Sequence, residues 1–208
     1  MKKGKLLIIS GFSGVGKGTV VKYMQENYAD YTVSVSATTR QPRENEINGI
    51  HYHYMTNEQF REMIRNDQLL EYASYVEHYY GTPREFVESN LDKGCNVILE
   101  IETQGALKVK AKMPEAVMIF ILPPDADTLK QRLIGRNTES EEVIWKRLEK
   151  AAEETDAIDY YEYFVINDEI EKCANNINKI VTGDEPDLPD KEQVLQIKKD
   201  ILRFSKGE

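Results

Sequence analysis

The sequence predicts an α/β fold in which a central parallel sheet is covered by helices on both faces, giving three layers. Continuous apolar runs of strand length, such as residues 96–101 (NVILEI) and 116–122 (AVMIFIL), alternate with segments whose apolar residues recur at helical spacing. Strands that are buried on both faces read as such unbroken runs, and alternation of strand and helix is typical of parallel sheets. A chain of 208 residues is long enough for one sizeable core with a small subdomain, so two unrelated full domains are not expected.

The first half of the chain predicts a strand, a glycine loop and a helix, followed by a small β element. Residues 5–10 (KLLIIS) form a short apolar run that ends at Gly11, and a helix is expected over residues 17–27. Residues 33–55 alternate and contain turn signals, so short strands are expected there. Helix starts are expected where Thr is followed three residues later by Gln or Glu, a signal that occurs at Thr56/Gln59, Thr82/Glu85 and Thr138/Glu141.

The second half continues the alternation of strand and helix. A short strand is expected at residues 163–167 (YFVIN), and residues 183–190 are rich in Pro, Gly and Asp, which predicts a linker to a last amphipathic helix. The other helices are expected at residues 104–112, at 125–135, from 138 onward and at 169–181.

Composition excludes several classes of protein. The formal net charge of −9 argues against a protein that wraps nucleic acid, so an anionic ligand must be bound by local groups of cationic side chains. No apolar stretch approaches the roughly 20 residues of a membrane-spanning helix, and the basic N-terminus lacks the rest of an export signal. Cys95 and Cys173 have no metal-ligand spacing and are expected to be small buried hydrophobic residues. A cytoplasmic location is expected, without a nucleic-acid or membrane partner.

A phosphate-binding motif lies between the first expected strand and helix. The pattern G-x-x-x-x-G-K and the two residues after it comprise Gly11, Phe12, Ser13, Gly14, Val15, Gly16, Lys17, Gly18 and Thr19. Glycines let successive backbone N–H groups face phosphates, the helix N-terminus adds positive potential, and Lys17 supplies a full charge. A glycine-rich turn without function is the alternative, and the combination of strand, glycines, lysine and helix argues against it.

The motif departs from its usual form at one position. Gly18 stands where a Ser or Thr normally supplies a hydroxyl to Mg²⁺, and Thr19 comes one residue later. Either Thr19 helps to bind the metal, or Mg²⁺ keeps more water and relies on carboxylates elsewhere, which suits its slow dehydration.

Four further segments carry a resemblance to a known family. They are residues 34–43 (SVSATTRQPR), 46–52 (EINGIHY), 71–73 (EYA) and 79–82 (YYGT). In this order and near these spacings they resemble guanylate kinases, as does the whole chain to about residue 182. The resemblance implies a P-loop fold and an enzyme that uses ATP and Mg²⁺ to phosphorylate GMP to GDP. It further implies that Arg40, Arg43, Tyr52 and Tyr80 bind the GMP phosphate, and that Ser36, Glu71 and Thr82 bind its base.

The chemistry of these side chains suits those roles. A monophosphate is a compact anion, and planar guanidinium groups with phenolic hydroxyls supply directional donors to its oxygens. Guanine presents two adjacent donors on its pairing edge, so one carboxylate such as Glu71 can accept from both. Adenine would leave that buried carboxylate unpaired, which is costly. The alternative for Glu71 alone is a surface residue.

Two more groups are assigned by the resemblance. Glu100 lies near the end of the strand expected at residues 96–101 and Glu102 follows it, with Glu102 at the family's usual Asp, near magnesium and the acceptor. Positive charge in a mobile lid would stabilise the transferring phosphoryl group; the lid arginines are Arg132, Arg136 and Arg147. A helix surface with salt bridges to nearby glutamates is the alternative for them. Asn167 matches a family position near the adenine of ATP.

The expected organisation follows from these assignments. A guanylate kinase-like domain spans residues 1–182, with a core at 1–33 and 83–182, a GMP-binding subdomain at about 34–82 and a lid at about 132–147. Residues 183–208 are expected to form the linker and a C-terminal helical extension. An inert scaffold module of similar fold, or a kinase for another phosphorylated substrate, are the competing functions; Lys17 argues against the first and Glu71 with Thr82 against the second. The sequence leaves open the use of dGMP beside GMP and the formation of a homo-oligomer.

Overall fold

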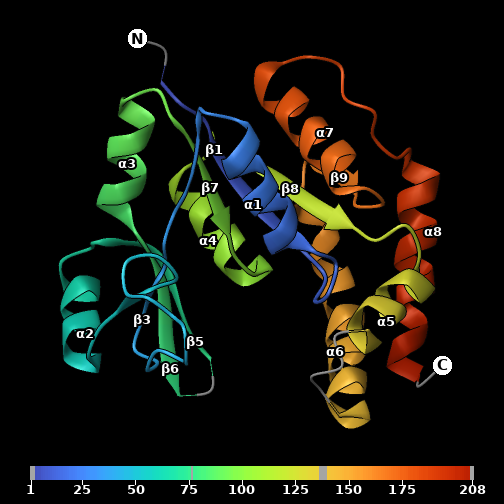
Figure 1. Ribbon diagram of the computed structural model, residues 1–208, viewed down its shortest axis with the longest axis horizontal. Coiled ribbons are helices and arrows are strands. Elements are labelled where there is room, and N and C mark those ends of the chain that lie inside the picture. The colour runs from blue at the N-terminus through green and yellow to red at the C-terminus, as the bar shows by residue number, and fades with distance from the viewer. Residues whose placement is uncertain (1–2, 76, 136–139, 207–208) are drawn as a thin grey trace. The chain divides into compact units, whose positions relative to one another are not determined.

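The computed structural model describes residues 3–75, 77–135 and 140–206 (Figure 1). A five-stranded sheet has the strand order β2-β7-β1-β8-β9, and a smaller four-stranded sheet has the order β4-β3-β6-β5. The strands of the larger sheet are β1 (Leu6–Gly11), β2 (Tyr31–Val33), β7 (Asn96–Glu100), β8 (Val117–Leu122) and β9 (Tyr163–Ile166). β2 pairs with β7 and β8 pairs with β9 in parallel, so the predicted α/β class is confirmed.

The chain divides into two compact units, of which the first comprises Met1–Ile8 and Ala29–Val117. It holds the small sheet of β3 (Ala37–Thr38), β4 (His53–Tyr54), β5 (Leu69–Tyr75) and β6 (His78–Pro83), with α2 (Asn57–Arg65), α3 (Arg84–Asp92) and α4 (Thr103–Lys112). Phe60, Leu69 and Ala37 form a buried cluster there. The capping box of Thr56 and Gln59 is present at the start of α2, as predicted.

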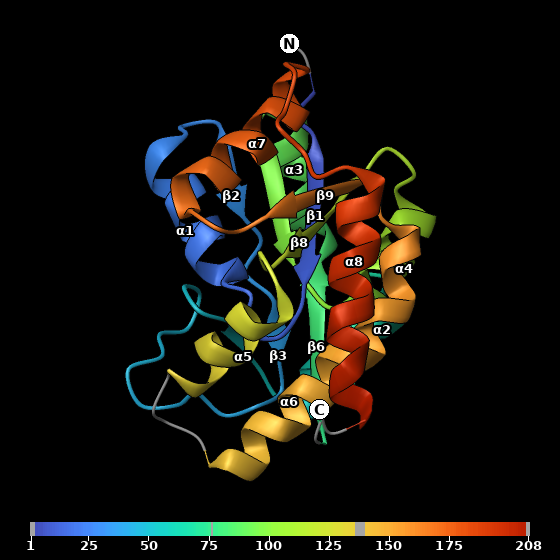
Figure 2. The same ribbon diagram turned by 90° about the vertical axis from the view of Figure 1, so that its right-hand side faces the viewer.

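The second unit comprises Ile9–Tyr28 and Met118–Glu208. Its helices are α1 (Lys17–Asn27), α5 (Ala126–Ile134), α6 (Glu141–Glu154), α7 (Ile170–Thr182) and α8 (Lys191–Ile201), with the 3₁₀ helices η1 (Thr155–Tyr160) and η2 (Leu202–Lys206). α1 packs against α7, and Figure 2 shows α7 and α8 on opposite sides of β8.

The C-terminal extension packs against the helices that precede it. α8 and η2 contact α6, and Val194, Ile197, Ile201 and Phe204 are buried. The side-chain amide of Asn176 donates to the Asp187 carbonyl at 2.8 Å and accepts from the Asp187 N–H at 3.0 Å, which ties the linker to α7. Among the described residues, no helix combines the length and apolar character needed to cross a bilayer.

Two predicted capping boxes have different outcomes. The box of Thr82 and Glu85 is wrong: Thr82 lies in β6, Pro83 is the N-cap of α3, and no side chain caps that helix. The Thr82 hydroxyl donates instead to a buried carboxylate, an interaction with a distant part of the chain that local spacing does not reveal. Thr138 lies outside the described residues, and α6 begins at Glu141 with Ser140 as its N-cap.

Candidate functional site

The glycine loop joins β1 to α1 and is anchored by buried apolar side chains. Phe12 and Val15 are fully buried, and the Phe12 ring meets Phe120 edge to face. Gly14 and Gly16 adopt φ values of 87° and 96°, which residues with a Cβ rarely adopt. A Cβ on Gly16 would also lie 2.7 Å from the side-chain nitrogen of Asn167. Both the backbone conformation and the packing of this loop therefore require glycine.

Lys17 lies in the first turn of α1 and folds back over the loop. Its ammonium donates to the Gly11 carbonyl at 2.6 Å and to the Phe12 carbonyl at 3.2 Å. Thr19 is exposed two residues further along the helix. The cation is thus held at the loop whose conformation suits a bound anion.

Arg132 and Asn167 hold the backbone of the same loop. Arg132 donates to the Val15 carbonyl at 3.1 Å and to the Asn167 carbonyl at 2.8 Å. Asn167, which is 3% exposed, donates from its side chain to the Val15 carbonyl at 2.8 Å. The side-chain oxygen of Asn167 is buried and accepts no hydrogen bond from the described residues. It is therefore a buried acceptor whose hydrogen-bonding capacity is unused among these residues.

The predicted lid arginines have three outcomes. Arg132 contacts the loop backbone from α5, and Arg147 donates from α6 to the Ser13 hydroxyl at 3.3 Å. Arg136 lies outside the described residues. Within the second unit, the structure thus brings Arg132, Arg147 and Asn167 to the loop that carries Lys17.

The first unit places Arg40 among aromatic and acidic side chains. The Arg40 guanidinium lies 5.4 Å from the ring centroid of Tyr52, and the Tyr52 and Tyr80 rings meet at 6.0 Å. Glu46 pairs with Arg40 at 2.9 Å, and this hydrogen bond is the main reason that the pKa of Arg40 is raised above its ordinary value. Arg43 has an exposed side chain, and its backbone N–H donates to Glu46 at 2.7 Å. Glu46 also belongs to this group of side chains, although the sequence predicted no role for it. The sequence feature that could have pointed to it is its position six residues after Arg40.

Glu71 and Thr82 form a buried polar pair on neighbouring strands. Glu71 is 7% exposed and Thr82 is 1% exposed, and the Thr82 hydroxyl donates to Glu71 Oε1 at 2.8 Å. Burial raises the pKa of Glu71, because an apolar environment disfavours the charged form, while the Thr82 hydrogen bond and the charges of Lys108 and Lys112 lower it. A buried carboxyl with a shifted pKa marks a candidate ligand-binding group.

Gly105 in α4 leaves the space that the Glu71 carboxylate occupies. A Cβ at position 105 would lie 3.0 Å from Glu71 Oε2 and 3.3 Å from its carboxyl carbon. Two lysines hold α4 against β5: Lys108 donates to the Tyr72 carbonyl at 2.9 Å and Lys112 to the Leu69 carbonyl at 3.2 Å. The helix and the carboxylate are therefore closely fitted.

The remaining predicted residues of the first unit lie at more open positions. Ser36 is half-buried, and its carbonyl accepts from the His53 N–H at 2.9 Å. Glu100 is exposed at the end of β7, and its charge contributes to a raised pKa of Tyr52 that is caused mainly by burial. Glu102 is exposed and is the N-cap residue of α4 without a side-chain capping bond.

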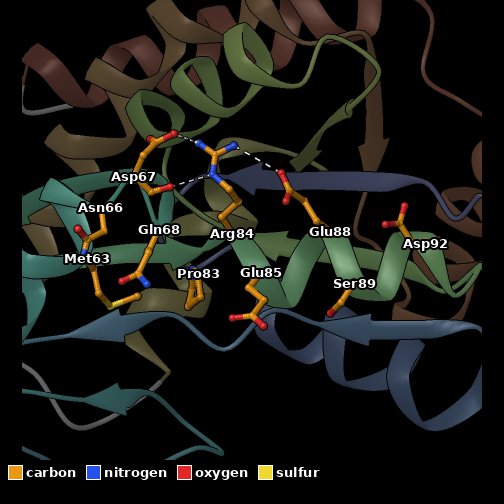
Figure 3. Close-up of a pocket in the computed structure, with 10 residues that line it drawn as sticks. All are labelled: Met63, Asn66, Asp67, Gln68, Pro83, Arg84, Glu85, Glu88, Ser89 and Asp92. Carbon is orange, nitrogen blue, oxygen red and sulfur yellow. Dashed lines mark hydrogen bonds and ion pairs between the residues drawn. The ribbon is translucent and has the colours of Figure 1, made fainter.

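A pocket of about 560 Å³ lies beside α3, and none of the predicted site residues lines it (Figure 3). Arg84 in this pocket is engaged by Asp67 at 2.8 Å and by Glu88 at 3.5 Å. Glu85 and Asp92 add further negative charge to the lining. Because its cation is already paired, this pocket does not suit a phosphate.

Comparisons with known proteins identify the family of this chain. Residues 3–184 match the family model described as Guanylate kinase. The guanylate kinase of Caldanaerobacter subterraneus subsp. tengcongensis is 49% identical over 183 residues, which cover 88% of this chain and 89% of that protein. The guanylate kinase of Oceanobacillus iheyensis is 48% identical with the same coverage. The crystal structure of guanylate kinase from Anaplasma phagocytophilum superposes with a TM-score of 0.70 at 32% identity, covering 88% of this chain and 86% of that one.

Proposed function

Because this chain belongs to the guanylate kinase family, we propose that its two groups of site residues serve the two substrates of one reaction. That reaction is the transfer of the γ-phosphoryl group of ATP to GMP, which gives ADP and GDP. The glycine loop with its neighbouring cations binds ATP, and the small sheet with the residues that follow it binds GMP. The buried pair of Glu71 and Thr82 is the observation that carries the choice of a guanine base.

The guanine base is recognised through a hydrogen-bond acceptor, the Glu71 carboxylate, and not through shape alone. The ionised carboxylate of Glu71 accepts from the two adjacent N–H groups of the guanine edge. Thr82 orients this carboxylate in the free protein, and its hydroxyl can rotate toward the carbonyl oxygen of the base, beside Ser36. An adenine edge would leave the buried charge without donors, which disfavours AMP.

The phosphate of GMP is bound by cationic and phenolic groups. Arg40 and Arg43 supply charged donors, and Tyr52 and Tyr80 supply hydroxyls next to Arg40. The attacking phosphate oxygen is already ionised near neutral pH, because the second pKa of a monophosphate is about 6. The reaction therefore needs no histidine base, and Glu100 and Glu102 act through charge rather than by removing a proton.

The phosphates of ATP lie on the glycine loop, residues 11–19, with Lys17 at the outer phosphates. Asn167 offers its buried unpartnered oxygen to the adenine amino group, and it also holds the loop through Val15. Arg132, Arg136 and Arg147 stabilise the charge that develops on the transferring group. The contact of Arg147 with the Ser13 hydroxyl in the loop supports its place in this group.

Magnesium is proposed to arrive with ATP. Among the described residues there is no cluster of three His, Cys, Asp or Glu side chains that could hold a metal ion. The Thr19 hydroxyl and the Glu102 carboxylate are oxygen donors of the kind that Mg²⁺ prefers, and this ion commonly keeps several waters and binds through substrate phosphates and one or two protein groups. The exposed Thr19 hydroxyl and Glu102 are the candidate protein groups, and the ion supplies neutralisation of phosphate charge.

The proposed substrates and the free cysteines fit a cytoplasmic location. Cys173 is buried, and burial raises the pKa of its thiol to about 12, so it remains an unreactive thiol at neutral pH. Cys95 is half-buried and is also free.

An assay of ATP consumption across nucleoside monophosphates tests the proposed function. The value of kcat/KM is expected to be at least about a hundredfold higher for GMP than for AMP, UMP and CMP. A site built to accept hydrogen bonds from the base is left with an unpaired buried acceptor when the base lacks those donors. Excess EDTA should abolish turnover and excess Mg²⁺ should restore it. A preference for AMP or UMP would contradict the assignment of Glu71.

A substitution at Gly105, which packs against the Glu71 carboxylate, provides a second test of the same site. Gly105→Ala is expected to displace the Glu71 carboxylate and to raise KM for GMP about tenfold, since small misplacements of binding groups have large effects. KM for ATP should stay unchanged in steady-state kinetics. Gly to Ala inside a helix ordinarily stabilises by about 1 kcal/mol, so a lowered melting temperature would independently report the clash. An unchanged KM for GMP together with raised stability would show that the carboxylate does not need this space.

A further inference from the structure

Arg40 is held by a carboxylate through two hydrogen bonds. Nη1 of Arg40 donates to Glu46 Oε2 and Nη2 donates to Glu46 Oε1, both at 2.9 Å. This is the bidentate geometry in which a guanidinium and a carboxylate meet edge to edge. The two side chains are only 14% and 18% exposed, so the pair is more than a chance contact on the surface.

Glu46 is itself fixed by the surrounding loop. Its Oε2 accepts from the Arg43 backbone N–H at 2.7 Å and from the Tyr54 hydroxyl at 2.7 Å. Asn45 adopts a φ of 67°, an uncommon conformation for a non-glycine residue, immediately before Glu46. The hydrogen bonds from Arg40 and Arg43 lower the pKa of Glu46 to about 2, so the carboxylate is ionised throughout the working range of pH.

The pairing decides which edge of Arg40 remains for a ligand. A guanidinium has five N–H donors in one plane, and Glu46 occupies the edge between Nη1 and Nη2 while Nη1 also donates to the Gln41 carbonyl at 2.7 Å. The Tyr52 and Tyr54 rings lie at 5.4 and 5.8 Å from the guanidinium carbon and restrict its plane. The edge between Nε and Nη2 takes no part in the pairing with Glu46, although the Tyr80 hydroxyl also interacts with the Arg40 side chain. This edge has the spacing to bind two oxygens of a phosphate.

We propose that Glu46 is a positioning residue, which holds Arg40 so that the Nε–Nη2 edge is presented to the phosphate of GMP. The inference rests on the proposed function, in which Arg40 binds that phosphate. Glu46 has a cost, because its charge repels the phosphate dianion. Holding Arg40 in place lowers the entropy cost of binding. A free arginine side chain must give up rotamer freedom when the ligand binds, and a side chain that is already held gives up less.

A competing role for Glu46 is also physically reasonable, and it predicts a change in GMP binding of the opposite sign. If Glu46 acted as an internal competitor for Arg40, its removal would free the cation and tighten GMP binding. If it acts as the positioning residue, its removal weakens GMP binding although a negative charge has been taken away from an anion site. The direction of the change therefore decides between the two.

The test uses Glu46→Gln with Glu44→Gln as the matched control. Glu44 lies in the same exposed loop, two residues away, so the control removes the same charge from the same region. Calorimetry would measure the binding of GMP and of guanosine, which lacks the phosphate, and kinetics would measure KM for both substrates. We expect Glu46→Gln to weaken GMP binding about tenfold and to leave guanosine binding and KM for ATP unchanged. Glu44→Gln should change GMP binding less than twofold.

Three results would overturn the proposal. Tighter binding of GMP by Glu46→Gln would identify a competitor, and unchanged binding would show that Arg40 needs no support. Equal weakening of GMP and guanosine would show a general disturbance of the small sheet rather than a loss of phosphate contact.

Arg40→Ala separates this inference from the proposed function. If Arg40→Ala weakens GMP but not guanosine, the phosphate site stands, and Glu46→Gln then tests the positioning role alone. If Arg40→Ala leaves GMP binding unchanged, the assignment of Arg40 itself fails. A double variant of both residues should bind GMP no more weakly than Arg40→Ala, because a residue that acts through Arg40 has no effect in its absence.

Discussion

Lys17→Ala is expected to reduce kcat about a thousandfold or more while GMP binding remains intact. Removing one preorganised donor from a transition state typically costs two to three orders of magnitude, and Lys17 is proposed to place a full charge at the phosphates of ATP. The GMP-binding groups belong to other elements of the chain, so calorimetry should give an unchanged dissociation constant for GMP. KM for ATP should rise as well, since the ammonium also contacts ground-state phosphates.

The control for this variant is Lys22→Ala on the same helix. Lys22 is largely exposed, with a side chain 74% accessible, and its ion pair with Glu26 is long, at 3.8 Å. Its loss should leave kcat within about twofold, as expected for an exposed pair of little energetic weight. Because Lys17 also bonds to the Gly11 carbonyl, a melting curve is needed to show that the variant is folded. Turnover near the original rate in a folded Lys17→Ala protein would show that the loop does not act on ATP as proposed.

Glu71→Gln is expected to lower kcat/KM for GMP by at least about a hundredfold. Glutamine has nearly the same shape, but it replaces one charged acceptor oxygen by an amide group that donates. One of the two guanine N–H groups then meets a donor instead of an acceptor, and both lose the charge-assisted part of the bond. The assay is steady-state kinetics with GMP, with Glu115→Gln at an exposed position as the control. A loss of less than about threefold would remove Glu71 from the base-reading role.

The same substitution should raise the stability of the ligand-free protein. Burial raises the pKa of Glu71 in the folded state above its value in the unfolded chain. The folded protein therefore binds the proton more readily, so the ionised carboxylate is a cost to stability above the raised pKa. That cost disappears as the pH falls through the raised pKa, and it is absent in Glu71→Gln at any pH. Melting temperatures at neutral and mildly acidic pH should converge for the two proteins on the acidic side.

The affinity of the wild-type protein for GMP should decrease as the pH falls, whereas the stability cost of Glu71 disappears as the pH falls. Protonation of Glu71 as the pH falls removes the acceptor of the guanine N–H groups, so KM for GMP should rise in the wild-type protein. The GMP phosphate also titrates, with a second pKa of about 6, and this titration is shared by Glu71→Gln. The ratio of the two KM values across pH therefore isolates the carboxyl. A constant ratio would show that protonation of Glu71 does not control GMP binding in this pH range.

Much of the fold and of the candidate site could be predicted because the signals are local. The apolar runs at residues 96–101 and 116–122 became β7 and β8, and the box of Thr56 and Gln59 became the start of α2. The glycine loop was predictable for the same reason: its conformation, its cation and its place before a helix are all encoded within nine consecutive residues, 11–19. The division into a core, a GMP-binding subdomain and a lid at the stated boundaries stays a prediction.

The sequence by itself determined the fold class and the glycine loop, and it predicted the residue types proposed to bind a monophosphate, because each depends on short-range periodicity or on a contiguous motif. Only the tertiary structure decided what those residues touch. Thr82 had the spacing of a helix cap, yet its hydroxyl bonds to Glu71, and Arg40 had the chemistry of a phosphate ligand, yet one edge of it is held by Glu46. Asn167 and Arg132, far from the loop in the chain, both bond to Val15. Such contacts depend on where separate segments meet in the folded protein, and no pattern within one segment contains that information.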